Sequence, residues 1–219
     1  MKPEMDLRKF RFSRLNDPEF RHLKLLVYWP LFGAVFWFLE RFSPITEYHT
    51  VYCALDEYIP FLEIFLLPYL FWFVYLIGMH IYTAIYDVAS FRYLMRFVII
   101  SYTVTAVIYI LYPTCQEFRP EVFPRDNALT RFIDWFYEFD THTNVCPSLH
   151  VAYSIGIASV WTKEKGASRA WKVFVVVAVI LICLSTMFIK QHSAVDFFAA
   201  LPVCLLAEYI VYGRRKKAP

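Results

Sequence analysis

Residues 61–86 read FLEIFLLPYLFWFVYLIGMHIYTAIY, and this apolar stretch decides the fold class. Glu63 is its one acidic or basic residue apart from a histidine. The hydrocarbon core of a bilayer requires about 20 consecutive apolar residues in a helix. The stretch is long enough, and its apolar residues are continuous rather than alternating, which favours a helix over a β-barrel strand. We therefore predict a transmembrane helix here.

Five further apolar runs accompany this one, and they cover residues 25–39, 97–112, 148–162, 173–189 and 195–212. Apolar residues make up 59% of the 219 residues and the mean hydropathy is +0.44. A soluble domain of this size could not bury so much apolar surface in one core. The sequence thus predicts an all-α, polytopic membrane protein, a six-transmembrane-helix bundle formed by a single membrane domain, 1–219.

The basic residues predict the orientation of this bundle. If the N-terminus is cytoplasmic, the outer segments hold few of the 22 lysines and arginines, namely Arg41, Arg119, Arg125, Arg131 and Lys190. This asymmetry follows the positive-inside rule. We therefore expect a plasma-membrane protein with both termini in the cytoplasm, a cytoplasmic N-terminal segment at 1–24 and a basic cytoplasmic tail at 213–219.

The longest segment between predicted spans, 113–147, is extracytoplasmic in this topology. It mixes acidic, basic and aromatic residues and is not of low complexity. Within it, residues 131–139 read RFIDWFYEF, in which apolar and charged residues alternate at helical spacing. We expect this segment to form a short interfacial helix in the outer loop.

His192 and Asp196 stand at the start of the last predicted span. On a helix, residues four positions apart share a face, so the carboxylate can accept a hydrogen bond from one imidazole nitrogen. That bond fixes the tautomer and leaves the other nitrogen free as a nucleophile or a base. The alternative is a structural pair at a helix start, but ionisable groups at membrane depth favour a functional role.

The run Pro147-Ser148-Leu149-His150 opens the fourth predicted span. Proline suits the first turn of a helix, and Ser148 places a hydroxyl and free backbone N–H groups at the positive helix end, where a phosphate can bind. His150 would lie near the same anion and could donate a proton to a leaving oxygen. The alternative reading is a serine cap next to a chance histidine.

Two cations stand near these histidines in the predicted topology. The guanidinium of Arg119 suits phosphate oxygens, and Lys190 could be a second cation for the same phosphate. The alternatives are a solvated loop arginine and an interfacial lysine. We interpret His49, Asp56 and Glu57 as solvated loop residues rather than as the lining of an entrance.

Two histidines and an aspartate could also bind zinc, but the chain contains neither an HExxH motif nor a CxxC pair. A metal-free mechanism through a phosphohistidine accounts better for the cations and the helix end. We therefore expect no metal and no cofactor.

The polar clusters resemble, in order and internal spacing, the motifs of the type-2 phosphatidic acid phosphatase superfamily, over roughly residues 50 to 210. The motifs of that family read K-x6-R-P, P-S-G-H and S-R-x5-H-x3-D. Here they read Y-x6-R-P from Tyr112, P-S-L-H from Pro147 and S-T-x5-H-x3-D from Ser185. The P-S-L-H and K-Q-H-x3-D sequences are similar to the inositol-phosphorylceramide-synthase-like branch.

The resemblance implies a role for each matching residue. His192 would be the nucleophile that forms a phosphohistidine, with Asp196 orienting it. His150 would be the general acid and then the base for the acceptor, while Arg119 and Ser148 would bind phosphate. Members of the branch include phosphatases and phosphotransferases, and none of these roles requires a metal.

The chain differs from the family pattern at three motif positions. Tyr112 stands in place of the lysine, Leu149 in place of the glycine and Thr186 in place of the arginine. Two phosphate-binding cations of the family are therefore replaced, and our hypothesis is that Lys190 substitutes for one of them.

The favoured function is an integral membrane lipid-phosphate phosphatase acting on the extracytoplasmic face, with phosphatidic acid-like or polyprenyl pyrophosphate lipids as substrates. An alternative is a phosphotransferase that moves a phosphorylated headgroup between lipids. A second alternative is a non-catalytic lipid-binding or transport protein on the same scaffold. We expect a phosphate-bearing lipid and membrane lipids as partners, and no nucleic acid.

Overall fold

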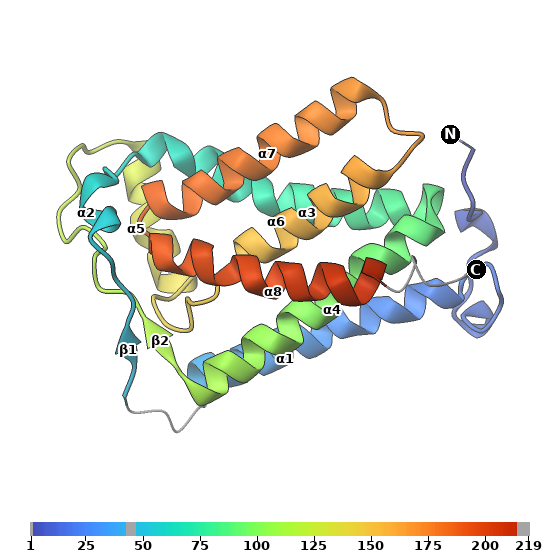
Figure 1. Ribbon diagram of the computed structural model, residues 1–219, viewed down its shortest axis with the longest axis horizontal. Helices are drawn as coiled ribbons and strands as arrows, with labels where there is room; N and C mark the ends of the chain where they lie inside the picture. Colours follow the sequence, from blue (N-terminus) through green and yellow to red (C-terminus); the bar gives the residue numbers. More distant parts are fainter. Residues whose placement is uncertain (1, 43–46, 214–219) are drawn as a thin grey trace.

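A computed structural model describes residues 2–42 and 47–213, and it is a bundle of helices (Figure 1). Of the predicted basic tail, only Gly213 lies among the described residues. The long helices are α1 (Tyr28–Arg41), α3 (Leu66–Tyr86), α4 (Val88–Leu111), α6 (Leu149–Lys163), α7 (Arg169–Phe188) and α8 (Ala194–Tyr212). The shorter elements are η1 (Leu7–Lys9), η2 (Phe12–Arg14), η3 (Arg21–Val27), β1 (His49–Thr50), α2 (Leu55–Tyr58), η4 (Glu63–Phe65), β2 (Thr114–Cys115) and α5 (Ala128–Phe139).

Five helical segments of the described chain are long and apolar enough to cross a membrane, and they are Arg21–Arg41, Glu63–Tyr86, Val88–Leu111, Arg169–Phe188 and Ala194–Tyr212. They coincide with five of the six predicted spans. The largest difference in position is at α4, which begins nine positions before the predicted start at 97, because the Asp87 side chain caps its N-terminus by accepting from Ser90 N at 2.9 Å. The chain is thus a helical membrane protein.

The remaining predicted span, 148–162, corresponds to α6, which has 15 residues and is about 22 Å long at the helical rise. This is shorter than the hydrocarbon core of a bilayer, about 30 Å. Helices α3, α4, α7 and α8 surround α6, and Figure 1 shows it inside the bundle. Gly156 allows α6 to approach α4 closely, because a Cβ at this position would lie 2.6 Å from Phe97 Cδ1.

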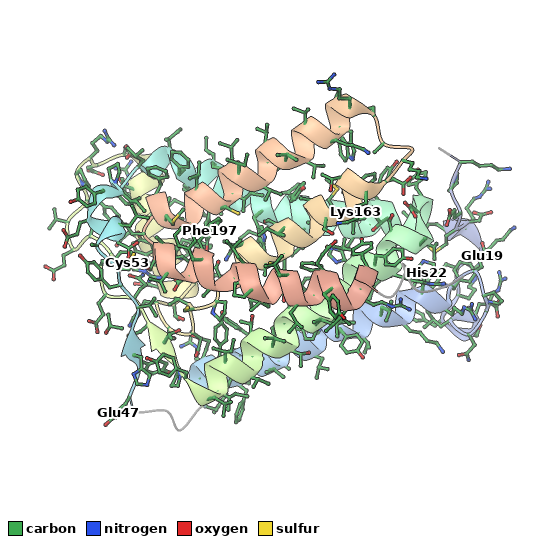
Figure 2. All side chains as sticks on the ribbon, viewed as in Figure 1. Glu19, His22, Glu47, Cys53, Lys163 and Phe197 are labelled. Carbon is green, nitrogen blue, oxygen red and sulfur yellow. The ribbon has the colours of Figure 1, made fainter. Side chains whose placement is uncertain are left out.

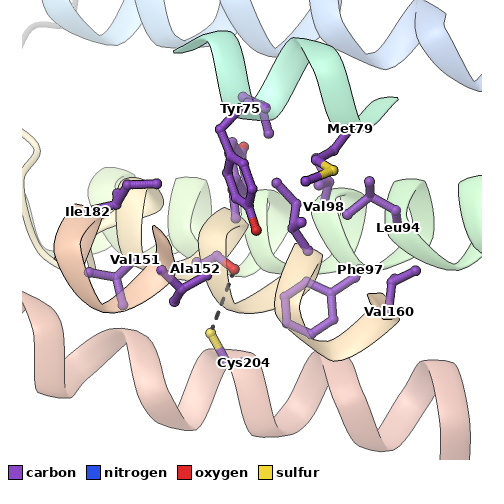
Figure 3. Packing of buried hydrophobic residues seen from close by; sticks show 14 of the residues in the cluster. Tyr75, Met79, Leu94, Phe97, Val98, Val151, Ala152, Val160, Ile182 and Cys204 are labelled. Atoms are coloured by element: carbon purple, nitrogen blue, oxygen red, sulfur yellow. Dashed lines mark hydrogen bonds between the residues drawn. The ribbon is translucent and has the colours of Figure 1, made fainter. Parts of the chain in front are cut away.

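The main core lies where α6 meets its four neighbours. Figure 3 shows Tyr75 and Val98 facing Val151 and Ala152 of α6, all of them buried. The outer flanks of the long helices carry exposed aliphatic side chains instead, such as Val74, Ile180 and Leu205. Contiguous exposed apolar surface of this extent would be unfavourable in water, and lipid covers it in a bilayer.

Four short elements are gathered at one end of the bundle, where Figure 1 shows α2, α5, β1 and β2 together. Strands β1 and β2 pair in parallel, with His49 opposite Thr114. The N-terminal turns and the last turn of α8 lie at the opposite end, and Figure 2 shows Glu19 there, far from Glu47 and Cys53. The two ends of the described chain therefore share one end of the bundle.

Helix α5 is the predicted amphipathic helix, and it begins three residues earlier than expected. Asn127 caps it, accepting from Thr130 N at 3.1 Å, while the Thr130 hydroxyl accepts from Asn127 N at 3.0 Å. Its buried side chains Ile133 and Phe136 pack in a small core with Tyr69 at the start of α3. This packing places α5 beside the candidate site.

Candidate active site

His192 and Asp196 are hydrogen-bonded, Nδ1 to Oδ2, at 2.9 Å. The prediction that they share a helix face is wrong, because His192 precedes Ser193, the N-cap of α8. The pair forms across the capping box instead, in which Asp196 Oδ2 also accepts from Ser193 N at 3.1 Å. Asp196 is fully buried, and the imidazole Nε2 of His192 is left available for a ligand.

The His150 ring faces the His192 ring, with ring centroids 5.7 Å apart and planes at 65°. His150 lies in the first turn of α6, and its ring contacts Trp72 at 4.2 Å and Tyr69 at 4.6 Å between centroids. Its Nε2 is buried and has no hydrogen-bond partner among the described residues. The structure thus brings together two histidines that are 42 positions apart in the sequence.

Both histidines line one cavity of about 600 Å³. Its other polar lining residues are Glu40, Arg41, Asp140, Thr141, Thr143, Asn144 and Gln191. Aromatic side chains from α1, α3, α4 and α6 make up most of the remaining wall. A cavity with convergent polar groups in an otherwise apolar lining is typical of a small-molecule site.

Arg119 binds acceptors of the chain itself. Its guanidinium donates to Tyr137 O at 3.0 Å, to Asp140 O at 2.7 Å and to the side-chain oxygen of Gln191. It also lies 4.2 Å from the centroid of the Tyr137 ring. Burial lowers the pKa of Arg119, but this guanidinium stays charged at any physiological pH. The structure therefore places Arg119 behind Gln191 and Asp140, which themselves line the cavity.

Lys190 lies outside the cavity lining. Its ammonium donates to Asp56 O at 3.0 Å and to Ile59 O at 2.5 Å, so it holds the segment around α2. Burial lowers the pKa of the Lys190 ammonium. Its backbone adopts φ 55°, and this turn ends α7 and directs the chain toward His192. The structure does not bring the Lys190 ammonium to the two histidines.

Ser148 is the N-cap of α6, as the sequence suggested, and it is fully buried. Its hydroxyl accepts from Val151 N at 3.5 Å, and its own N–H donates to Asp196 O at 3.2 Å. The second contact links the start of α6 to the start of α8. Ser148 thereby helps to set the distance between the two histidines.

The residues at the differing motif positions have structural contacts. The backbone oxygen of Thr186 accepts from His192 N at 2.9 Å, so this position still anchors the nucleophile candidate. Tyr112 stacks on His49, with centroids 4.0 Å apart. Neither residue lines the cavity that contains the histidines.

Asp56 is the most important residue that the sequence reasoning missed. It is buried rather than solvated, and it accepts from Ser193 Oγ at 2.6 Å and from Ala194 N at 2.8 Å. A carboxylate at this point also interacts favourably with the positive end of α8. Asp56 therefore fixes the chain immediately after His192.

Glu40 joins the C-terminal end of α1 to the loop after α5. It accepts from the side chains of Thr143 and Asn144, each at 2.8 Å, and from the hydroxyl of Thr141. Arg41, the next residue, lines the same cavity and makes no hydrogen bond or ion pair with the described residues. The first predicted span is thus part of the site, which no motif indicated.

In the part of the chain that the structure describes, no three histidine, cysteine or carboxylate side chains are grouped as a metal ion would require. Comparisons with protein-family models, with curated proteins and with solved structures gave no match to this chain.

Proposed function

We propose that the chain is an integral membrane lipid-phosphate phosphatase that works through a phosphohistidine. The observation that carries the proposal is the arrangement of the two histidines in one cavity. Asp196 holds Nδ1 of His192, and the His150 ring faces the same imidazole at 5.7 Å. A nucleophile, its orienting group and a second imidazole within reach of a reacting atom match the requirements of covalent group transfer.

In the first step, His192 Nε2 attacks the phosphorus of the lipid ester. The N–P bond forms as the P–O bond to the lipid breaks, and protonated His150 donates its proton to the departing oxygen. In the second step, His150 accepts a proton from water while the water oxygen attacks phosphorus. The N–P bond then breaks and inorganic phosphate is released, so both histidines return to their initial states.

Asp196 stabilises the charge that develops on the His192 ring when the N–P bond forms. Its burial strengthens that interaction, because the local dielectric is low. In this proposal Arg119 acts by holding Gln191 and Asp140 in the wall of the cavity, and Ser148 acts by joining α6 to α8. Direct phosphate contacts from Arg119, Ser148 or Lys190 would require their side chains to leave present partners.

The proposed topology has six spans. The short helix α6 and the loop residues directly before it together form one of them. The proposal further places both termini in the cytoplasm of a plasma-membrane protein, the histidines at the extracytoplasmic face, and α5 in the interface. The exposed aromatic side chains of α5, Trp135 and Phe139, suit such a position. A cysteine introduced at Asp126 should then react with a membrane-impermeant maleimide on intact cells, and one at Lys165 only after permeabilisation. The reverse pattern would contradict the topology.

A phosphotransferase is the second candidate, because hydroxyl-binding groups line the same cavity. Asn144 Oδ1 is buried and has no hydrogen-bond partner among the described residues, and Glu40 lies beside it. An alcohol held there could replace water in the second step. Assays with a labelled phospholipid, with and without an inositol or diacylglycerol acceptor, distinguish the two outcomes by whether label appears in phosphate or in a new lipid.

The central experiment measures phosphate release from a long-chain phosphatidic acid by purified protein, its His192→Ala variant and its His150→Ala variant. We expect no release by His192→Ala and a fall of about 10²–10⁴-fold in kcat for His150→Ala. Protein trapped with labelled substrate should carry acid-labile, alkali-stable label, which His192→Ala lacks. Full phosphate release by His192→Ala would overturn the mechanism and leave the non-catalytic alternative.

A further inference from the structure

The cavity that contains the histidines extends along one whole face of α1. Its lining residues on this helix are Trp29, Phe32, Gly33, Phe36, Trp37, Glu40 and Arg41. They recur every three or four positions, which is the spacing of a single helix face. From the first to the last of them the helix rises about 18 Å. The cavity is therefore a slot that follows three turns of α1, and the histidines line one part of it.

The polar and apolar residues of this slot are separated along its length. Glu40 and Arg41 lie at the outer end of α1, and Asp140 and Asn144 line the same cavity. Toward the start of α1 the lining side chains are aromatic. Two tyrosine hydroxyls of the cavity wall are already bound to backbone oxygens, Tyr102 to Phe32 O at 2.7 Å and Tyr109 to Pro147 O at 2.8 Å. These tyrosines therefore present carbon surface to a ligand.

Gly33 leaves a gap in this aromatic face. A Cβ added to it would meet no atom within 4 Å, whereas the residues one turn away on the same face are Trp29 and Trp37. The gap lies one to two helical turns from Glu40. A methylene group can lie in this gap without displacing a side chain.

We propose that this slot holds a hydrocarbon chain of the substrate, which is therefore a long-chain lipid phosphate ester rather than a small soluble one. This inference rests on the proposed function, because the histidines define the phosphate end. Each buried methylene contributes about 0.8 kcal/mol of transfer free energy, so the chain would supply much of the binding. In the proposed topology, the chains of an outer-leaflet lipid point from the headgroup toward the membrane centre. The slot runs the same way, from Glu40 toward the start of α1, so the lipid could enter beside α1 without changing its orientation.

The test compares Gly33→Trp with a matched control, Gly78→Trp. Gly78 is also exposed on a long helix with no atom within 4 Å of an added Cβ, but it does not line the cavity. Phosphate release is measured with phosphatidic acids that carry 16-carbon or 6-carbon chains. We expect Gly33→Trp to lower the ratio of kcat/KM for long over short chains by at least about tenfold, as loss of only two buried methylenes would. Gly78→Trp should leave this ratio at its wild-type value.

An unchanged ratio for folded Gly33→Trp would overturn the chain slot. Gly33→Leu gives the same comparison if the tryptophan variant does not fold. Failure of this inference is distinguishable from failure of the proposed function through His192→Ala. If that variant is inactive while Gly33→Trp affects both chain lengths equally, only the slot is wrong. If His192→Ala keeps its activity, the proposed function is wrong.

Discussion

Ser193 Oγ donates a hydrogen bond of 2.6 Å to Asp56 Oδ2, which joins residues 137 positions apart. The same carboxylate accepts from Ala194 N and from Cys53 N. Three donors thus converge on one buried side chain at the start of α8. Because His192 immediately precedes this start, the segment around α2 and the candidate nucleophile are held as one unit.

We expect Asp56→Ala to lower both thermal stability and activity. The substitution leaves buried donors without an acceptor, at a cost of about 1–3 kcal/mol for each. Asp56→Asn retains one acceptor oxygen and should have an intermediate effect. Thermal unfolding in detergent measures the change, with Glu57→Ala, the exposed neighbouring residue, as the control. An unfolding temperature for Asp56→Ala equal to that of the control would contradict this role.

The apolar runs predicted most of the fold because a helix that crosses lipid must be apolar along nearly its whole length. The helix starts were less predictable, since a cap such as Asp87 extends α4 through Arg92 and Arg96, which lie before the apolar run that begins at 97. Helix α6 shows the limit of the approach. Its apolar run has the composition of a span, but the helix has only 15 residues and packs against α3, α4, α7 and α8.

The motifs predicted which histidines meet, because the chemistry that we propose requires two imidazoles at one phosphorus. They did not predict the surroundings of the histidines. Asp56, Glu40 and Arg41 stand in segments whose local sequence is typical of solvated loops and helix ends. Asp56 and Glu40 bind partners more than 100 positions away, as in the bond from Asn144 to Glu40. No local pattern encodes such contacts.

Asp196→Asn should separate the orienting role of the carboxylate from its packing. The amide has the same shape but cannot stabilise a charged imidazole, and it can present a donor to Nδ1. We expect kcat to fall by about 10³–10⁴-fold, as for a comparable orienting aspartate elsewhere, with little change in unfolding temperature. The control is Asp126→Asn, the same substitution at an exposed aspartate just before α5, and its kcat should equal that of wild type. A kcat within threefold of wild type, about 0.6 kcal/mol, would assign Asp196 a purely structural role.

Asp140→Asn should make the protein more stable at neutral pH. Desolvation raises the pKa of the Asp140 carboxyl above its ordinary value, although the Tyr69 hydroxyl donates to it and lowers the pKa. An acid whose pKa is raised on folding destabilises the folded state as pH rises from the unfolded pKa to the folded pKa. The amide keeps an acceptor for Tyr69 and removes this cost.

The unfolding temperature of Asp140→Asn should therefore exceed that of wild type above the folded pKa, by about 2–4 °C for each kcal/mol. The difference should disappear below pH 4, where the carboxyl is protonated in both states. Scanning calorimetry in detergent between about pH 3 and pH 8 measures this difference, with the exposed Asp134→Asn as the control. A difference that is constant across this range would argue against desolvation as its cause.

Arg41 is the free cation that we expect to hold the substrate phosphate. It lines the same cavity as the two histidines and has no ion pair among the described residues, whereas the guanidinium of Arg119 and the ammonium of Lys190 are bound to oxygens of the chain. Arg41→Ala should raise KM for a phosphatidic acid by about tenfold, the equivalent of about 1.4 kcal/mol, and change kcat less. Arg41→Lys keeps the charge without the planar fork and should recover part of this loss.

The control is Arg131→Ala. It removes an arginine of α5 that pairs with Asp126 and does not line the cavity, so its KM should match that of wild type. Because the side chain of Arg41 is exposed, added salt should raise KM for wild type and have less effect on Arg41→Ala. If both proteins respond equally to salt, another group holds the phosphate.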